Sequence, residues 1–131
     1  MAKQPIGSMV WRDLTVADAQ GVRDFYASVV GWKAKPHPMG EYDDYEMQVA
    51  ETGETVAGIC HQRGLNADVP PQWLLYVQVD DVEERAAKCR AMGGEVIAGP
   101  RDMGEGRFCV IRDPAGATLA LYAPASGAEP A

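Results

Sequence analysis

Cysteine, positive charge and long apolar runs are all scarce in this sequence. The 131 residues include 3 cysteines, 2 histidines and 12 lysines and arginines, against 19 acidic residues, which gives a net charge of −7. An odd number of cysteines argues against a disulfide framework, and Cys60, Cys89 and Cys109 contain no CxxC pair for a zinc knuckle or thioredoxin-like centre. Nucleic acids and anionic membranes both require clustered positive charge, so we expect neither as a partner.

Targeting and cofactor motifs are scarce as well. No apolar run approaches the roughly 20 residues that span a bilayer, and residues 1–8 have no apolar core of the kind found in a secretory signal. No glycine-rich phosphate-binding loop is present. We therefore expect a cytoplasmic protein with reduced thiols and no cofactor. The 47% of hydrophobic residues and 24% of charged ones are typical of a folded domain.

The first half of the chain predicts a strand, a helix and three further strands. Residues 10–16 alternate between apolar and polar side chains. Asp18 is suited to cap a helix, because the apolar residues after it recur at the helical spacing i, i+3, i+4, i+7. The further strands are predicted at 32–36, 45–50 and 55–61, with a loop from Pro36 to Gly40 that contains His37.

The second half predicts the same series of elements. Residues 73–79 form a strand, Asp81 and Glu84 a carboxylate capping box, and Gly93-Gly94 the end of the second helix. Three strands follow at 95–98, 107–112 and 117–122, the last two joined by a turn over residues 113–116.

The two halves repeat at an offset of 63 residues. Val16 matches Val79, Asp18 matches Asp81, and the glycines at 31 and 53 match those at 94 and 116. A repeat of fixed period is an architectural signal, and it predicts an α+β fold of two tandem βαβββ repeats within one globular domain. The predicted parts are a tail at 1–8, a module at 9–62, a linker at 63–72, a module at 73–123 and a tail at 124–131.

This pattern resembles the vicinal oxygen chelate superfamily, which includes glyoxalase I, bleomycin-resistance proteins and extradiol dioxygenases. The resemblance is carried by Val16-Ala17-Asp18, Asp24-Phe25-Tyr26 and Gly31-Trp32, and then by Val77–Asp81, Gly93-Gly94, Gly106-Arg107 and Asp113–Gly116. It implies eight strands in a curved mixed sheet around a central cavity, and a homodimer. Whether the modules pair within one chain or across a swapped dimer stays open.

The resemblance also implies where a metal would bind. Metal-dependent members use His or Gln five residues before the Val of each V-x-D motif, and Glu on the last strand of each half. The corresponding positions here are Trp11, Leu74, Ala120 and either Ala57 or Gly58. None offers an ordinary donor atom, so we expect no metal at the family position, nor at His37 or His61.

Strand alternation predicts which side chains line the cavity. Phe108, Val110, Leu119 and Leu121 are assigned to the helix side, and Cys60 and Cys109 to the cavity side as small hydrophobes rather than nucleophiles. A mostly apolar hollow with a few polar groups is typical of small-molecule sites. The predicted ligand-binding wall consists of Trp11, Asp13, Gln48, Tyr76, Gln78, Arg107 and Tyr122.

Three functions are consistent with this wall. The first is metal-free binding of a small molecule, with aromatic or drug-like compounds among the candidates. The second is a lyase, isomerase or dioxygenase-type enzyme, with either a relocated metal or a metal-free reaction in which Asp13 removes a proton and Arg107 stabilises the enolate. The third is a protein-interaction module in which Trp11 fills the cavity and Asp13 and Arg107 form a plain ion pair.

Overall fold

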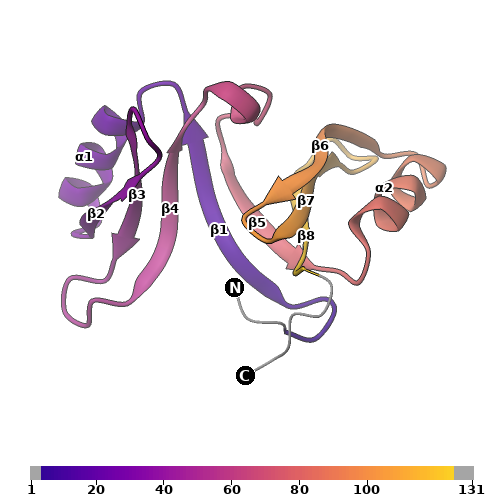
Figure 1. Cartoon of the computed structure of the whole chain (residues 1–131), viewed down its shortest axis with the longest axis horizontal. Helices are drawn as coiled ribbons and strands as arrows, with labels where there is room; N and C mark the ends of the chain where they lie inside the picture. Colours follow the sequence, from indigo (N-terminus) through magenta and orange to yellow (C-terminus); the bar gives the residue numbers. More distant parts are fainter. Residues whose placement is uncertain (1–3, 126–131) are drawn as a thin grey trace. The chain divides into compact units, whose positions relative to one another are not determined.

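The computed structural model describes residues 4–125, so the end of the predicted C-terminal tail and the first three residues of the N-terminal one lie outside the described residues. The chain forms two compact units (Figure 1). One consists of residues 12–73, and the other combines the chain through Trp11 with the residues from Leu74 onward. In the described part of the chain, neither helix is long and apolar enough to cross a membrane.

The unit of residues 12–73 is a four-stranded mixed sheet with one helix. Its strands lie in the order β2-β3-β4-β1, with β1 parallel to β4 and the other neighbours antiparallel. The chain leaves β1 through a helix and returns in three strands, as the sequence predicts. The elements are β1 (Met9–Val16), α1 (Ala19–Val29), β2 (Lys33–Pro38), β3 (Asp43–Gln48), β4 (Thr55–His61) and the short 3₁₀ helix η1 (Gly64–Asn66).

The other unit repeats this arrangement. Its strands lie in the order β5-β8-β7-β6, with β5 parallel to β8 and the remaining neighbours antiparallel. The α+β class and the βαβββ repeat are therefore confirmed. The elements are β5 (Trp73–Gln78), α2 (Val82–Ala91), β6 (Glu95–Met103), β7 (Gly106–Arg112) and β8 (Thr118–Ala123).

Each helix covers one face of its own sheet with apolar side chains. Around α1 the buried core consists of Ala19, Tyr45, Met47, Ala57 and Ile59, and Trp32 and Trp73 pack against it. Around α2 it consists of Val79, Val82, Ala86, Cys109, Leu121 and Ala123. These clusters define the helix side of each sheet, and the opposite side is the one that the sequence assigns to a ligand.

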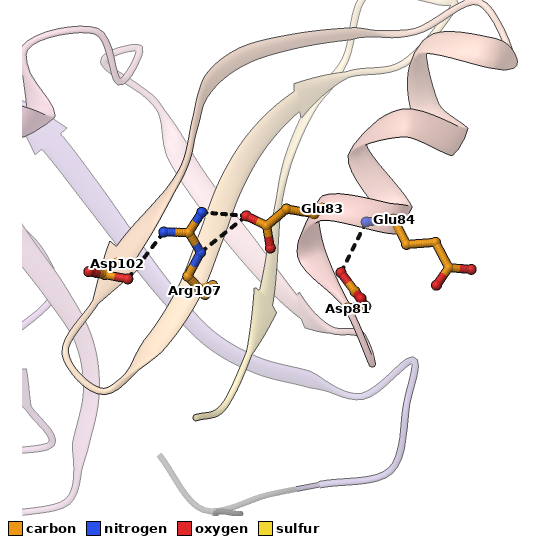
Figure 2. Close-up of polar contacts among 5 residues, drawn as sticks. All are labelled: Asp81, Glu83, Glu84, Asp102 and Arg107. Atoms are coloured by element: carbon orange, nitrogen blue, oxygen red, sulfur yellow. Dashed lines mark hydrogen bonds and ion pairs between the residues drawn. The ribbon is translucent and has the colours of Figure 1, made fainter. Parts of the chain in front are cut away.

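Both helices begin at the predicted aspartates. Asp18 Oδ1 accepts a hydrogen bond from the Gly21 amide at 3.0 Å, and Asp81 Oδ1 accepts one from the Glu84 amide at 3.0 Å (Figure 2). The capping box predicted at Asp81 is only half formed. The Asp81 amide donates instead to Asp80 Oδ1 at 2.9 Å, so the preceding carboxylate takes the place of the Glu84 side chain.

The turn between β7 and β8 is one residue longer than predicted. Arg112 pairs with Thr118 and not with Ala117, because the Asp113 carboxylate accepts hydrogen bonds from the Ala115 and Ala117 amides and Gly116 adopts a φ of +95°. A shift of one residue in a hairpin moves every side chain of a strand to the other face. The faces predicted for β7 are therefore wrong.

Two strands extend beyond their predicted ends. β2 continues through Pro38 and pairs His37 with Asp44, where a loop was predicted. It lies at the edge of its sheet, where proline does not interrupt a ladder on both sides. β6 continues to Met103 across a register shift at Gly99, whose φ is +73°. A Cβ there would lie 2.8 Å from the Phe108 carbonyl oxygen, so the backbones approach closely only because the residue is glycine.

Met47 provides a test of the core around α1, because its side chain is 0% exposed. We expect Met47→Ala to lower the free energy of unfolding by about 2–5 kcal/mol, since it leaves a cavity in the core. Met39→Ala is the matched control, because Met39 belongs to the same unit and is 44% exposed; it should cost less than about 1 kcal/mol. Equal losses for the two variants in urea unfolding would contradict this packing.

Candidate functional site

The sheet face opposite α1 carries a group of polar side chains. Leu14 pairs with Ile59 of the helix-side core, so its neighbour Asp13 lies on the other face, paired with Gly58. Gly58 also pairs with Glu46 of β3, which places Asp13, Gly58 and Glu46 in one row across three strands. We call this surface the acidic face; it comprises Asp13, Thr15, Asp44, Glu46, Gln48, Gly58 and Cys60.

Hydrogen bonds hold the outer part of the acidic face. Thr55 Oγ1 donates to Glu46 Oε1 at 3.3 Å, and Gln48 Nε2 donates to Thr55 Oγ1 at 3.3 Å. His37 Nδ1 lies 3.2 Å from Glu46 Oε2. Asp13 and Asp44, on the same face, are buried. Strand alternation therefore places Asp13 and Gln48 on the predicted side of the sheet, with the Gln48 amide oriented by Thr55.

In the other unit, the sheet face opposite α2 carries buried aromatic side chains. Tyr76 pairs with Ala120 and Gln78 with Tyr122, so these predicted wall residues share the side opposite α2. Tyr76 packs on the Phe108 ring with centroids 6.2 Å apart. All of these side chains are buried, and burial raises the pKa of Tyr122.

Gln78 binds the polypeptide backbone. Its Nε2 donates to the Gln4 carbonyl oxygen at 2.8 Å, and its Oε1 accepts from the Gln4 amide at 3.0 Å. The Gln78 main chain also bonds to Gly7 and Ser8. Gln78 therefore fastens residues 4–8 to the end of β5, and both ends of its amide are occupied.

Arg107 lies on the helix side of its sheet, contrary to the prediction. Figure 2 shows its guanidinium between Asp102 of β6, at 3.1 Å, and Glu83 of α2. The hydrogen bonds that Arg107 donates to Glu83 and then to Asp102 raise its pKa. The five-residue β7–β8 turn explains the difference, since Arg107 pairs with Ala123 of the α2 core. Two carboxylates already compensate its charge.

The chain matches the model of the Glyoxalase/Bleomycin resistance protein/Dioxygenase superfamily over residues 6–121. It belongs to this superfamily. It is 34% identical over 120 residues to the "Putative glyoxylase CFP32" of Mycobacterium tuberculosis, and 30% identical over 132 residues to the "Anthracycline biosynthesis protein DnrV" of Streptomyces peucetius. The matches cover 91% and 88% of this chain, but 45% and 46% of the two relatives. The chain thus spans less than half the length of the curated relatives it matches.

Solved members of the superfamily share the fold. A methylmalonyl-CoA epimerase in complex with methylmalonyl-CoA and NH4+ has a TM-score of 0.57 at 15% identity, covering 95% of this chain and 99% of the epimerase. The methylmalonyl-CoA epimerase of Mycobacterium tuberculosis has a TM-score of 0.52 at 16% identity, with 95% and 93% covered. These likenesses show the fold alone.

The positions that the resemblance assigns to the superfamily's metal ligands hold residues that do not fit a metal. Of the two alternatives on β4, Ala57 packs in the core around α1, so Gly58 is the residue on the opposite face. Leu74 and Ala120 are buried, and neither has a donor atom. Among residues 4–125, no three His, Cys, Asp or Glu side chains are grouped so that they could hold a metal ion. No step through a metal can be derived from these residues.

The half-buried Cys60 and the buried Cys109 are poor nucleophiles. Burial raises the pKa of the Cys60 thiol far above its usual range, and the charges of Asp13 and Asp44 raise it further. Burial, followed by Cys89 and Glu83, raises the pKa of Cys109 to about 11. Cys109 also packs in the core around α2 and not on the predicted cavity side. Since only the thiolate attacks, both residues act as small hydrophobes at neutral pH.

The predicted wall did not include Asp44 and Thr55. Asp44 follows the same alternation as Glu46 and Gln48 and could have been found from it. Thr55 could not have been found from the sequence, because its position beside Gln48 depends on the register shift after Met47. Trp11 is partly buried and belongs to the unit that contains β5.

Gln78 and Gln48 form a matched pair for testing the bond to residue 4. We expect Gln78→Ala to destabilise the protein by about 1–3 kcal/mol, because two buried hydrogen bonds to the Gln4 backbone are lost. Gln48→Ala removes one long hydrogen bond at a partly exposed position and should cost less than about 1 kcal/mol. Urea unfolding measures both, and a smaller loss for Gln78→Ala would contradict the role assigned to it.

The raised thiol pKa values predict slow alkylation. At pH 8 the Cys60 and Cys109 thiols stay protonated in the folded protein, so iodoacetamide should modify them far more slowly than in denatured protein. Because the folded state disfavours both thiolates, stability should also fall as the pH rises past the ordinary cysteine pKa. Peptide mapping by mass spectrometry checks the first expectation, and rapid labelling of native Cys60 would refute it.

Proposed function

We propose that this chain binds a small molecule at the acidic face and does so without the superfamily's metal. The observation that best supports this proposal is that Asp13, Gly58 and Glu46 lie in one row across β1, β4 and β3. A sheet is a rigid support for polar groups. The geometry supports recognition by side chains, since the metal positions offer no ligand.

The chemistry of the acidic face favours a cationic or donor-rich ligand. Asp13 and Glu46 are acceptors when ionised, and Gln48 keeps its amide oxygen as an acceptor because its Nε2 donates to Thr55. The net charge of −7 adds a long-range attraction for cations. A polyanion such as a CoA ester would be repelled, although solved epimerases of this fold bind one.

One relative points to a compound of this kind. The Streptomyces peucetius relative is named for anthracycline biosynthesis, and anthracyclines combine a planar aromatic system with a protonated amino sugar. We propose that the amino group binds at Glu46, whose carboxylate can accept a charge-assisted hydrogen bond. Arg107 has no part in this proposal because its charge is compensated.

The enzymatic alternative keeps Asp13 as the candidate base. It is supported by the position of Asp13, which is buried on the sheet face opposite α1. A lyase or isomerase would then remove a proton beside a carbonyl group, with a cation other than Arg107 stabilising the enolate. Asp13-dependent exchange of substrate protons in D₂O would favour this alternative.

The prediction of a cytoplasmic homodimer rests on the sequence and on the resemblance to the superfamily. Equilibrium sedimentation at micromolar concentration tests the dimer. A mass near 14 kDa, the mass of one chain, would contradict it.

We expect daunorubicin to bind more tightly than methylmalonyl-CoA, as measured by drug fluorescence and by calorimetry. Glu46→Gln should weaken daunorubicin binding by about tenfold, or roughly 1.4 kcal/mol, because it removes a charge-assisted hydrogen bond. Glu54→Gln is the control, since it removes the same charge from an exposed residue outside β3 and β4. It should leave the affinity unchanged.

The metal-free part of the proposal has its own control. Dialysis of untagged protein against a chelator should leave daunorubicin affinity unchanged. Stoichiometric zinc, nickel, iron or manganese after dialysis would refute the metal-free proposal. Tighter binding of methylmalonyl-CoA, or equal effects of Glu46→Gln and Glu54→Gln, would exclude the acidic face as the binding site.

A further inference from the structure

A histidine–carboxylate pair lies where β3 and β4 separate. The Cα ladder between the two strands ends at Tyr45 and Ile59. Beyond it, Asp44 Oδ1 accepts a hydrogen bond from the His61 backbone amide at 2.9 Å, and the same oxygen lies 3.2 Å from His61 Nδ1. One carboxylate oxygen therefore holds both the main chain and the ring of His61.

Burial makes this pair unlike an ordinary surface contact. The Asp44 side chain is 10% exposed and the His61 side chain 19%. The backbone amide fixes Asp44 and keeps its oxygen directed at Nδ1. A carboxylate in this position favours the tautomer with the proton on Nδ1, which leaves the lone pair on Nε2. His61 Nε2 is then a base with a defined direction.

Two tyrosine rings contact the imidazole of His61. The Tyr42 ring stands edge-on to it with centroids 5.1 Å apart, and the Tyr45 ring lies 6.3 Å away. The Arg63 guanidinium stacks over Tyr42 at 4.1 Å and lies 3.9 Å from Glu41. A flat, weakly polar substrate could contact the tyrosine rings, with Arg63 at the outer end.

We propose that Asp44 and His61 form a general acid–base dyad, with His61 as the catalytic base and Asp44 as its positioning residue. The substrate class is a small aryl ester. His61 Nε2 takes a proton from water while the water oxygen bonds to the ester carbonyl carbon and the C=O π electrons move to oxygen. The intermediate then re-forms the C=O bond and expels the aryl oxide, and the imidazolium returns its proton, giving one acid and one phenol.

The neighbouring cysteine does not supply the nucleophile. Cys60 precedes His61, but Asp44 and Asp13 disfavour its thiolate. Water activated by His61 is therefore the nucleophile in this proposal. The dyad does not depend on ligand binding at Glu46, so either proposal can fail without the other.

The chain contains a matched control for the dyad. His37 also places Nδ1 at 3.2 Å from a carboxylate, that of Glu46, but its side chain is 57% exposed and that of Glu46 is 32% exposed. The two pairs share chemistry and distance and differ in burial. A solvated pair orients its ring poorly, so His37 should show neither the tautomer nor the reactivity proposed for His61.

The first test is the tautomer of each histidine, measured by ring ¹⁵N NMR at a pH where both rings are neutral. We expect the Nδ1–H form for His61 in the wild type and the Nε2–H form, which predominates in free histidine, for His37. Asp44→Asn should shift His61 towards the free-histidine pattern. An Nε2–H ring at wild-type His61 would overturn the proposal.

The second test is hydrolysis of p-nitrophenyl acetate by the full chain. His61→Gln should lower the protein-dependent rate by at least about tenfold, and Asp44→Asn by a similar factor, with circular dichroism showing that both variants fold. His37→Gln should keep the wild-type rate, and the wild type should react more slowly in D₂O. The proposal fails if His61→Gln keeps the wild-type rate, if His37→Gln loses it, or if D₂O has no effect.

Discussion

Parallel pairing between the first and last strand of each module is the constraint on which the rest of the structure depends. β1 lies beside β4, and β5 beside β8. Since the intervening strands are joined as antiparallel neighbours, this pairing decides which side chains of all four strands face the helix. Leu14 opposite Ile59 sends Asp13 to the other face, and Val77 opposite Leu121 sends Tyr76 there. The same pairing in two modules nevertheless supports two very different faces, one acidic and one aromatic.

The two faces differ in how their polar side chains are hydrogen-bonded. In the module with β5, the single buried amide of Gln78 is fully bonded to the backbone of Gln4, so the remaining face can close as a hydrophobic core. In the module with β1, carboxylates lie on the opposite face, and burial, followed by the charges of Asp13 and Asp44, raises the pKa of Cys60. Asp44 and Glu46 of this face lie against His61 and His37, so this face keeps hydrogen-bonded carboxylates where the other buries aromatic rings.

The order of helices and strands could be predicted because it depends on short stretches of sequence. The site was harder to predict, because it depends on the register between neighbouring strands. Asp18 and Asp81 could be identified as helix caps because their effect is confined to one turn. Met47 could be placed on the helix side because alternation needs only neighbouring residues. The face of Arg107 could not be predicted, because it depends on whether the turn at Asp113 has four residues or five. The hydrogen bonds that decide the length of this turn are formed by the Asp113 side chain alone. His61 was placed on a strand, but its contact with Asp44 follows from where β3 and β4 separate.

The positions that the resemblance assigns to metal ligands and the acidic face meet at Gly58. Gly58 and Ala120 stand where the resemblance implies acidic ligands, Trp11 and Leu74 stand where it implies His or Gln, and none of these four residues offers an ordinary donor atom for a divalent cation. Carboxylates at Asp13 and Glu46 flank Gly58. Gly58 has no side chain that could ligate a metal, so in the proposed function the polar side chains of the same row contact the ligand directly.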